Sequence, residues 1–298
     1  MPRQASVRRS INWLTLLCLL VLSFSVNGHD LAEVKQTGVL RHLGIAYANF
    51  VTGDGRGLDV ELIQGFAHRL GVEYRYVESS WDRIFGDLTG TNAKRGANGA
   101  ILTDKTEIKG DVIANGMTIL PWRQEVISFS EPTFPSAVWL IADAYSSLHP
   151  ITPTGSLEKD IDQVKESMDG ISVLSMRNTC LDPNLYQLDK TKAQIRYLES
   201  SSNLNEMAPA VIGGVAETSL LDVPDALIAL DNWPGRLKVV GPVSNQQRMA
   251  AGFRKGSPEL LRAFNNYLNS IREDGSYNKL VAKYYPTVFD YYADFFQR

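Results

Sequence analysis

A segment able to bind an anion follows one short apolar run in this chain of 298 residues. Residues 111–115, DVIAN, predict a strand, and residues 116–123, GMTILPWR, come directly after it. This segment offers free backbone N–H groups, the Thr118 hydroxyl and the Arg123 guanidinium. Open α/β sheets bind ligands beyond the carboxyl ends of their strands, and a guanidinium matches a carboxylate with two parallel hydrogen bonds. The pattern therefore predicts a carboxylate clamp, although an arginine on a loop is ordinarily a surface residue.

Strands and helices alternate around this segment. Leucine or phenylalanine recurs every four residues from Leu58 to Leu70, and Gly71 follows, which predicts an amphipathic helix with a glycine stop. Ser156 can cap a second helix from Leu157 to Met168, and a third covers residues 260–271. Strands are expected at residues 72–77, 111–115, 137–142, 171–174, 194–198, 218–221, 237–240 and 249–254. This order favours an α/β fold with mostly parallel sheets.

The first residues are typical of a secretory signal peptide. Three arginines precede an apolar run at residues 13–24, and small or polar residues follow it. The run is short for a membrane span, so residues 1–29 are interpreted as a signal peptide, with an uncleaved anchor as the alternative. We therefore expect export to the periplasm.

Charge, cysteine content and length narrow the class of protein. Without residues 1–29 the formal charge changes from 30 − 33 = −3 to 27 − 33 = −6, so no basic field for nucleic acid is present. Only Cys180 remains, which excludes an intramolecular disulfide, and no metal-spaced His or Cys cluster occurs. About 270 residues exceed a usual single core and favour two lobes.

Five segments in order resemble the amino-acid-binding type of bacterial periplasmic solute-binding protein (extracellular solute-binding proteins, family 3). GMTILPWR with the later FSEPTF is similar to the family pattern G-M-T-I-T-P-x-R…F-S-x-P-[YF], with Leu120 in place of a threonine. The other segments are GVLR from residue 38, GLDVEL from residue 57, RKGSPEL from residue 254 and DGSY from residue 274. The resemblance implies a two-lobed type II fold. Lobe 1 would comprise residues 30–138 plus 247–298, lobe 2 residues 139–246, with two crossovers as a hinge.

The resemblance also implies how the α-carboxylate of a ligand is bound. Arg123 would bind it through the guanidinium and Thr118 through its hydroxyl and amide, while the Gly116 carbonyl faces the ammonium. Thr179 and its amide would complete the site from lobe 2, where Asn178 replaces a family glycine. Asn tolerates a positive φ better than most residues but is larger than glycine. Neighbouring Cys180 is interpreted as a buried, inert thiol.

A zwitterion also needs an acceptor for its ammonium, because a buried unpaired charge is costly. The sequence ETSLLD at residues 217–222 is similar to the family strand whose last Asp binds that ammonium, which implies Asp222. The alternative is an N-cap for the helix that Pro224 begins, and both roles are compatible. Glu217 is expected to be a surface strand residue.

Two aromatic residues align with family positions that stack on the ligand. They are Phe50, in the loop after the first strand, and Trp81, after the second, with Tyr47 as a weaker alternative. Large aromatic residues are core residues by default, so that reading stays open for each of them. No charged residue stands out as a selector, and the amino acid is not identified.

Two segments depart from the family pattern. Residues 89–106, rich in Gly, Asn, Lys and Arg, are interpreted as an inserted loop or hairpin that is solvated rather than bound to a partner. The aromatic tail after Lys283 resembles the connection that follows the binding module of membrane-bound lytic transglycosylases. We expect it to pack on lobe 1, with an exposed partner-binding patch as the alternative.

The sequence therefore predicts a periplasmic binding protein without catalytic activity, cofactor or metal. It would close its lobes on an amino acid or related zwitterion and deliver it to an inner-membrane permease, in ABC-type uptake, or to a sensor. One alternative is a regulatory module that senses cell-wall fragments or peptides. The other is an enzyme similar to cyclohexadienyl dehydratase, although the four histidines form no pattern with a nucleophile.

Overall fold

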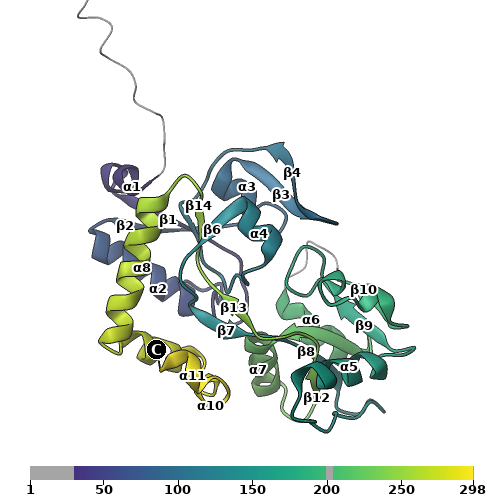
Figure 1. Ribbon diagram of the computed structural model, residues 1–298. Coiled ribbons are helices and arrows are strands. Elements are labelled where there is room, and N and C mark those ends of the chain that lie inside the picture. The colour runs from purple at the N-terminus through teal and green to yellow at the C-terminus, as the bar shows by residue number, and fades with distance from the viewer. Residues whose placement is uncertain (1–29, 199–203, 298) are drawn as a thin grey trace, which may run out of the picture.

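The fold contains two five-stranded sheets, each flanked by helices (Figure 1). The computed structural model describes residues 30–198 and 204–297, so the predicted signal peptide lies outside the described residues. The first sheet has the order β2 (Glu73–Glu78), β1 (Val39–Gly44), β5 (Val112–Ile113), β14 (Gly252–Arg254), β6 (Ile127–Phe129). The second has the order β10 (Gln194–Tyr197), β9 (Ser172–Ser175), β11 (Thr218–Asp222), β8 (Val138–Asp143), β12 (Leu237–Pro242). We call these sheets, with their helices, lobe 1 and lobe 2.

Both sheets are mostly parallel, as expected. In lobe 1, β14 is antiparallel to both of its neighbours, and in lobe 2 the same is true of β8. β1 is parallel to both β2 and β5, and β9 is parallel to both β10 and β11. The prediction of a two-lobed α/β fold is confirmed. This topology brings the carboxyl ends of β1 and β5 to one edge of the first sheet.

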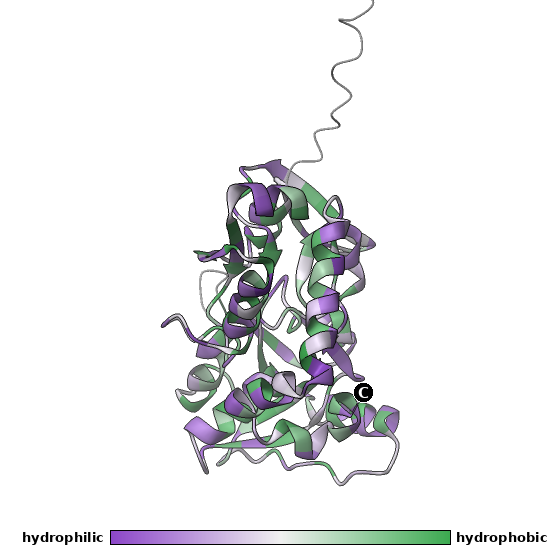
Figure 2. Ribbon diagram, turned by 90° about the vertical axis from the view of Figure 1, so that its left-hand side faces the viewer, coloured by the Kyte–Doolittle hydropathy of each residue, from purple (hydrophilic) through white to green (hydrophobic). Residues whose placement is uncertain are grey.

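Amphipathic helices cover the sheets and bury their apolar faces. Those of lobe 1 are α1 (Leu31–Thr37), α2 (Leu58–Leu70), α3 (Ile84–Thr89), α4 (Pro121–Val126), α8 (Pro258–Glu273) and α9 (Ser276–Tyr284). Those of lobe 2 are α5 (Leu157–Ser167), α6 (Met207–Ile212) and α7 (Val223–Asn232), with short 3-10 helices at Pro183–Tyr186, Leu188–Lys190 and Leu204–Glu206. Figure 2 shows helices of mixed apolar and polar colour around the strands, as amphipathic helices require. No helix among the described residues has the length and apolar character needed to cross a membrane.

The predicted periodicity of the first long helix is confirmed. Its four periodic positions, Leu58 to Leu70, lie in α2, where Leu58, Leu62 and Phe66 are buried. Gly71 ends the helix with a φ of 72°, a backbone conformation that glycine adopts without strain. The strand expected over residues 249–254 is wrong as a single element. It forms β13 (Gln247–Met249) and β14, which belong to different sheets.

Two antiparallel strands join the lobes. β7 (Phe134–Ser136) pairs with β13, and each leads directly from one five-stranded sheet to the other. Both chain crossings therefore run side by side between the lobes, as Figure 1 shows.

The inserted segment and the tail both contact the opposite lobe. Residues 89–106 form a hairpin of β3 (Thr91–Gly96) and β4 (Gly99–Lys105), in which Arg95 lies 3.6 Å from the carboxylate of Asp182 in lobe 2. The tail forms α10 (Val288–Tyr291) and α11 (Ala293–Phe296). The Phe296 carbonyl accepts a hydrogen bond from Asn278 of α9 in lobe 1, and its ring packs edge-on against Phe134 of β7. Tyr292 packs against the cluster that contains Val223 of α7. The tail thus packs on lobe 1, as expected, and also reaches lobe 2.

Candidate functional site

Arg123 lies in the first turn of α4 and is fully buried. Leu120 is extended at the N-cap position and Pro121 begins the helix, which fixes the direction of this turn beyond β5. Nη1 of Arg123 donates to the Thr118 carbonyl at 2.9 Å. Nη2 donates at 3.3 Å to the carbonyl of Asn178, which belongs to lobe 2. The guanidinium therefore lies between the lobes.

Aromatic rings surround this guanidinium. Its central carbon lies 5.4 Å from the ring centre of Trp81 and 5.5 Å from that of Trp122, within the range of cation–π attraction. Burial lowers the pKa of Arg123 to about 10. No carboxylate of the described residues forms an ion pair with it, so its charge is compensated by neutral groups alone.

Thr118 and Gly116 lie immediately before this turn. The Thr118 hydroxyl is buried, and its one described neighbour that responds to it is the Cys180 thiol, whose pKa it lowers. Gly116 has a φ of 65°, and a Cβ there would lie 2.5 Å from the Phe50 ring, so only glycine fits. Its N–H donates at 2.7 Å to the carboxylate of Asp59, whose pKa burial raises to about 7. Asp59 belongs to the GLDVEL motif, which by itself indicates no role for this acid.

Asp222 ends β11 in lobe 2 and is buried. It is the N-cap of α7, since its Oδ1 accepts the Asp225 N–H at 3.2 Å, and the predicted N-cap role is confirmed. Its other oxygen lies 3.4 Å from the Cys180 thiol, and the Tyr47 hydroxyl also donates to this carboxylate. Burial raises the pKa of Asp222 to about 6, and no Lys or Arg of the described residues pairs with it. An acid so placed can accept a ligand's ammonium.

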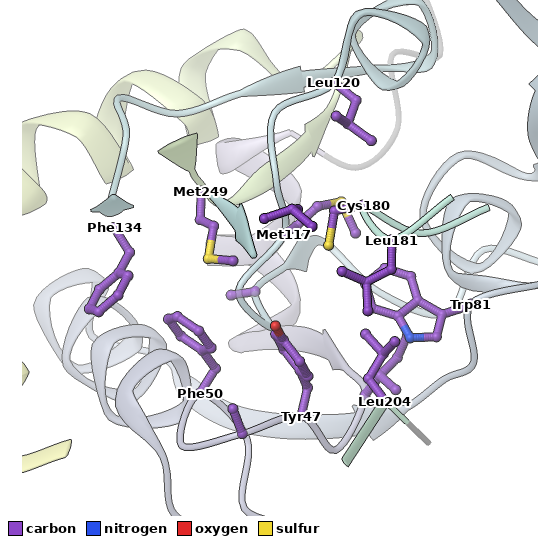
Figure 3. Packing of buried hydrophobic residues seen from close by; sticks show 14 of the residues in the cluster. Tyr47, Phe50, Trp81, Met117, Leu120, Phe134, Cys180, Leu181, Leu204 and Met249 are labelled. Atoms are coloured by element: carbon purple, nitrogen blue, oxygen red, sulfur yellow. The ribbon is translucent and has the colours of Figure 1, made fainter. Parts of the chain in front are cut away.

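The two predicted aromatic positions differ in their surroundings. Trp81 lies against the Arg123 guanidinium, and its stacking on a ligand stays a prediction. Phe50 is fully buried in lobe 1, where it packs edge-on against Phe134 and stacks on Tyr47 at 5.9 Å. Figure 3 shows Tyr47 pointing from this stack toward Met117 and Cys180. Tyr47, the weaker alternative in the sequence, is therefore the aromatic residue that reaches Asp222.

Thr179 is buried beside Arg123 but its hydroxyl serves the local turn. That hydroxyl donates to the Met176 carbonyl at 2.9 Å and accepts the Leu181 N–H at 3.0 Å. Asn178 has a φ of 62°, so it adopts the left-handed conformation expected at the family's glycine position. The backbone of this turn, rather than the Thr179 hydroxyl, is what faces the guanidinium.

Cys180 lies between the two charged groups. It is buried, as predicted, and burial with the nearby Asp222 raises the pKa of its thiol, whereas Arg123 lowers it. Arg123 also lowers the pKa of Tyr186, and Asp222 raises it. These shared neighbours show that the arginine of lobe 1 and the acid of lobe 2 lie in one buried region.

Two further sequence expectations concern the surroundings of this region. Glu217 is an exposed residue before β11, as predicted, and accepts hydrogen bonds from the Ser172 N–H and hydroxyl. Within residues 30–198 and 204–297, no three His, Cys, Asp or Glu side chains are grouped as metal ligands would be. The charged groups described at the meeting of the lobes are the Arg123 guanidinium and the Asp222 carboxylate.

Comparison with known proteins places the chain in a family. The family model of bacterial extracellular solute-binding proteins, family 3, matches residues 94–287. The L-cystine-binding protein TcyJ of Escherichia coli is 24% identical over 89% of each chain. A membrane-bound lytic murein transglycosylase F of Desulfosudis oleivorans is 27% identical over 79% of this chain, which spans 46% of that protein.

The fold agrees with this assignment. A crystal structure of an ancestral amino-acid-binding protein, a precursor of cyclohexadienyl dehydratase, superposes with a TM-score of 0.67 at 25% identity. The match covers 86% of this chain and 99% of that structure. The family expected from the order of the sequence motifs is confirmed, and the chain belongs to the bacterial extracellular solute-binding proteins, family 3.

Proposed function

We propose that this protein captures an amino acid or related small zwitterion between its lobes in the periplasm, without catalysis. The lobes close on the ligand by bending at β7 and β13, and the loaded protein delivers it to an inner-membrane permease of the ABC type. Arg123 binds the ligand's carboxylate and Asp222 its ammonium. The observation that carries this proposal is a buried guanidinium and a buried acid, each without an ionic partner among the described residues.

Arg123 supports the carboxylate half of the proposal. A buried guanidinium that meets only carbonyls and aromatic rings keeps much of its desolvation cost. A carboxylate that approached it would form charge-assisted, bidentate hydrogen bonds. The buried Thr118 hydroxyl lies at the same strand end and can donate to the same anion. The ligand's carboxylate would thus meet a guanidinium that is paired only with carbonyls and a hydroxyl that can turn toward it.

Asp222 supports the ammonium half. Its present donors are a phenol, a thiol and a backbone N–H, all of them neutral. An ammonium provides three donors and a full positive charge, so its arrival would lower the raised pKa of this acid. Because Arg123 belongs to lobe 1 and Asp222 to lobe 2, a ligand that contacts both favours the closed arrangement.

Isothermal titration calorimetry tests this proposal directly. Micromolar binding corresponds to about 8 kcal/mol, which two buried charge pairs and an aromatic wall can supply. Purified protein would be titrated with the proteinogenic amino acids, then with matched ligands lacking either the carboxylate or the ammonium. We expect only zwitterions to bind, and Asp222→Asn to weaken them strongly. Equal binding of an amino acid and its decarboxylated amine would refute the role of Arg123.

A sensory role is the second candidate. The likeness to a lytic transglycosylase over most of the chain, and the tail that resembles the segment after its binding module, favour a partner other than a permease. Cross-linking in intact cells, followed by identification of the captured protein, separates the two roles. Capture of a permease subunit supports transport, and capture of a cell-wall enzyme supports sensing.

A further inference from the structure

The turn at residues 178–181 of lobe 2 touches both charged groups of the proposed site. The Asn178 carbonyl accepts a hydrogen bond from Arg123 at 3.3 Å, and the Cys180 thiol lies 3.4 Å from the Asp222 carboxylate. The position of this short turn therefore affects both the place where a carboxylate would bind and the place where an ammonium would bind.

Tyr186 holds this turn from within lobe 2. It ends the 3-10 helix Pro183–Tyr186, which Asp182 caps. Its side chain is buried, and its hydroxyl donates a hydrogen bond to the Cys180 carbonyl. Burial raises the pKa of this phenol, so the hydroxyl keeps its proton and stays a donor. The hydroxyl thus fixes the backbone of the residue whose thiol faces the acid of the site.

The same hydroxyl is also bound from the strands between the lobes. Gln247 is the first residue of β13, where it pairs with Ser136 of β7, and its Nε2 donates to the Tyr186 hydroxyl at 3.1 Å. Because this hydroxyl already donates to the Cys180 carbonyl, it must accept from the Gln247 amide, which settles the direction of both hydrogen bonds. A continuous chain of hydrogen bonds therefore runs from β13 to the turn of the site.

Stability alone does not explain a glutamine at this position. The Oε1 atom of Gln247 is buried and has no hydrogen-bond partner among the described residues. A buried amide oxygen without a partner destabilises the folded state, whereas methionine would fill a similar space without that cost. What an apolar side chain could not provide is the hydrogen bond to Tyr186.

Two contacts from lobe 1 reach the same part of lobe 2. Arg123 of α4 donates to the Asn178 carbonyl, and Arg95 of the β3–β4 hairpin lies 3.6 Å from the Asp182 carboxylate. Together with the Gln247 amide, they hold the turn and its following helix from three elements outside lobe 2. Of the three contacts, only that of Gln247 comes from the strands that join the lobes.

We infer that Tyr186 and Gln247 are positioning residues that couple the turn at residues 178–181 to β13. Closure of the lobes brings the Gln247 amide to the Tyr186 hydroxyl and holds the turn in its ligand-binding position. When the direction of β13 changes relative to lobe 2, the amide leaves the hydroxyl and the turn loosens. The importance of the pair for binding rests on the proposed function, whereas its hold on the turn can be measured without a ligand.

The reactivity of Cys180 toward 5,5′-dithiobis(2-nitrobenzoic acid) measures how firmly the turn is held. Cys180 is buried, and a Cys18→Ser background leaves it as the only thiol of the full chain. The reagent reaches the thiol only when the turn opens, so the rate follows the open population. We expect Tyr186→Phe and Gln247→Met each to raise the rate about 3-fold to 10-fold, the range of one ordinary hydrogen bond. The double variant should react no more than about twofold faster than Tyr186→Phe, because both substitutions break one link.

Tyr277→Phe is the matched control. Tyr277 is a buried tyrosine of lobe 1 whose hydroxyl also donates to a backbone carbonyl, that of Thr133. This variant should lose stability in urea as Tyr186→Phe does, yet keep the wild-type reactivity of Cys180. An equal rise in the control would mean that general destabilisation exposes the thiol, and the inference would be overturned. An unchanged rate in Gln247→Met would overturn it as well, and this variant decides the question even where Tyr186→Phe does not fold.

Ligand protection separates this inference from the proposed function. A mixture of the proteinogenic amino acids should slow the modification of Cys180 in the wild-type protein. If the mixture has no effect, capture of an amino acid fails, while the ligand-free rates still decide the role of Tyr186 and Gln247. If the mixture protects the wild type but the variants react at the wild-type rate, capture stands and the coupling of the turn to β13 is refuted.

Discussion

Replacement of Arg123 by methionine should separate ligand binding from stability. Methionine fills a similar volume without the charge, so it removes the proposed carboxylate contact and leaves the packing against Trp81 and Trp122 largely intact. We expect binding of any zwitterion to weaken at least about 100-fold, because a buried charge-assisted pair is lost. We also expect the stability of the ligand-free protein to change little.

The expected change in the free energy of unfolding follows from the burial of the guanidinium. Desolvation lowers the pKa of Arg123 from its ordinary 12.5 to about 10. Because one pKa unit corresponds to about 1.4 kcal/mol, burial of this charge costs the folded state about 3 kcal/mol. Attraction to the two tryptophan rings offsets about 1 kcal/mol each. Methionine also removes the hydrogen bonds to the carbonyls of Thr118 and Asn178, which offset about 1 kcal/mol each. The variant Arg123→Met should therefore change the free energy of unfolding by no more than about 2 kcal/mol.

Arg254 provides a matched control within the same lobe. It is also buried, but it lies 3.1 Å from the Asp111 carboxylate and donates to the carbonyl of Leu88 at 3.0 Å. Removal of one partner from a buried pair is destabilising, so Arg254→Met should lower the free energy of unfolding by about 3 kcal/mol. Urea denaturation of the ligand-free proteins measures both effects. Calorimetry should show that Arg254→Met, where it is folded, binds ligand as the wild type does.

Equal destabilisation by the two substitutions would refute this reasoning. It would mean that Arg123 is held by interactions as strong as the ion pair of Arg254, and that its charge is not reserved for a ligand. Undiminished affinity in Arg123→Met would refute the assignment of the carboxylate contact. Since the two variants differ only in position, a general effect of losing an arginine is controlled for.

Carboxylates of the two lobes give three further expected outcomes. Affinity for an amino acid should fall up to tenfold per pH unit below about pH 6, where Asp222 becomes protonated, and calorimetry across this range should show no such slope in Asp222→Asn. Burial raises the pKa of Asp59 to about 7, so its contribution to stability is complete below about pH 4 and is lost as pH rises through 7. This loss amounts to about 4 kcal/mol of the free energy of unfolding, and urea unfolding should show that it is absent in Asp59→Asn. Arg95→Ala should weaken ligand binding no more than about fivefold by calorimetry, because its ion pair with Asp182 is long and partly exposed.

The elements of this fold were predictable where periodicity and local chemistry agree. The apolar repeat and glycine stop of α2, and the proline after Asp222 that begins α7, are local signals, and both elements form where expected. The strand expected over residues 249–254 failed for a non-local reason. Ala250 and Ala251 carry the chain from the ribbon between the lobes into the first sheet, and no residue type marks such a transition.

The candidate site was only partly predictable. Arg123 and Asp222 stand in motifs, but whether each had an ionic partner depended on segments far away in the sequence. The sequence favours Phe50 over Tyr47, yet the stack of the two rings directs the tyrosine hydroxyl toward Asp222.

Neutral groups occupy the positions that the two charges of a zwitterion would take, and this explains how a ligand can control the closed arrangement. The Asn178 carbonyl meets the guanidinium where a carboxylate would, and the Tyr47 hydroxyl meets Asp222 where an ammonium would. Each of these contacts joins one charged group to one neutral group, whereas a ligand's carboxylate and ammonium would place opposite charges together at both positions and meet the guanidinium with two parallel hydrogen bonds. The contacts between the lobes are therefore weaker without a ligand than with one. A zwitterion that replaces both neutral groups strengthens the contact at each charge, so closure depends on a ligand that carries both charges.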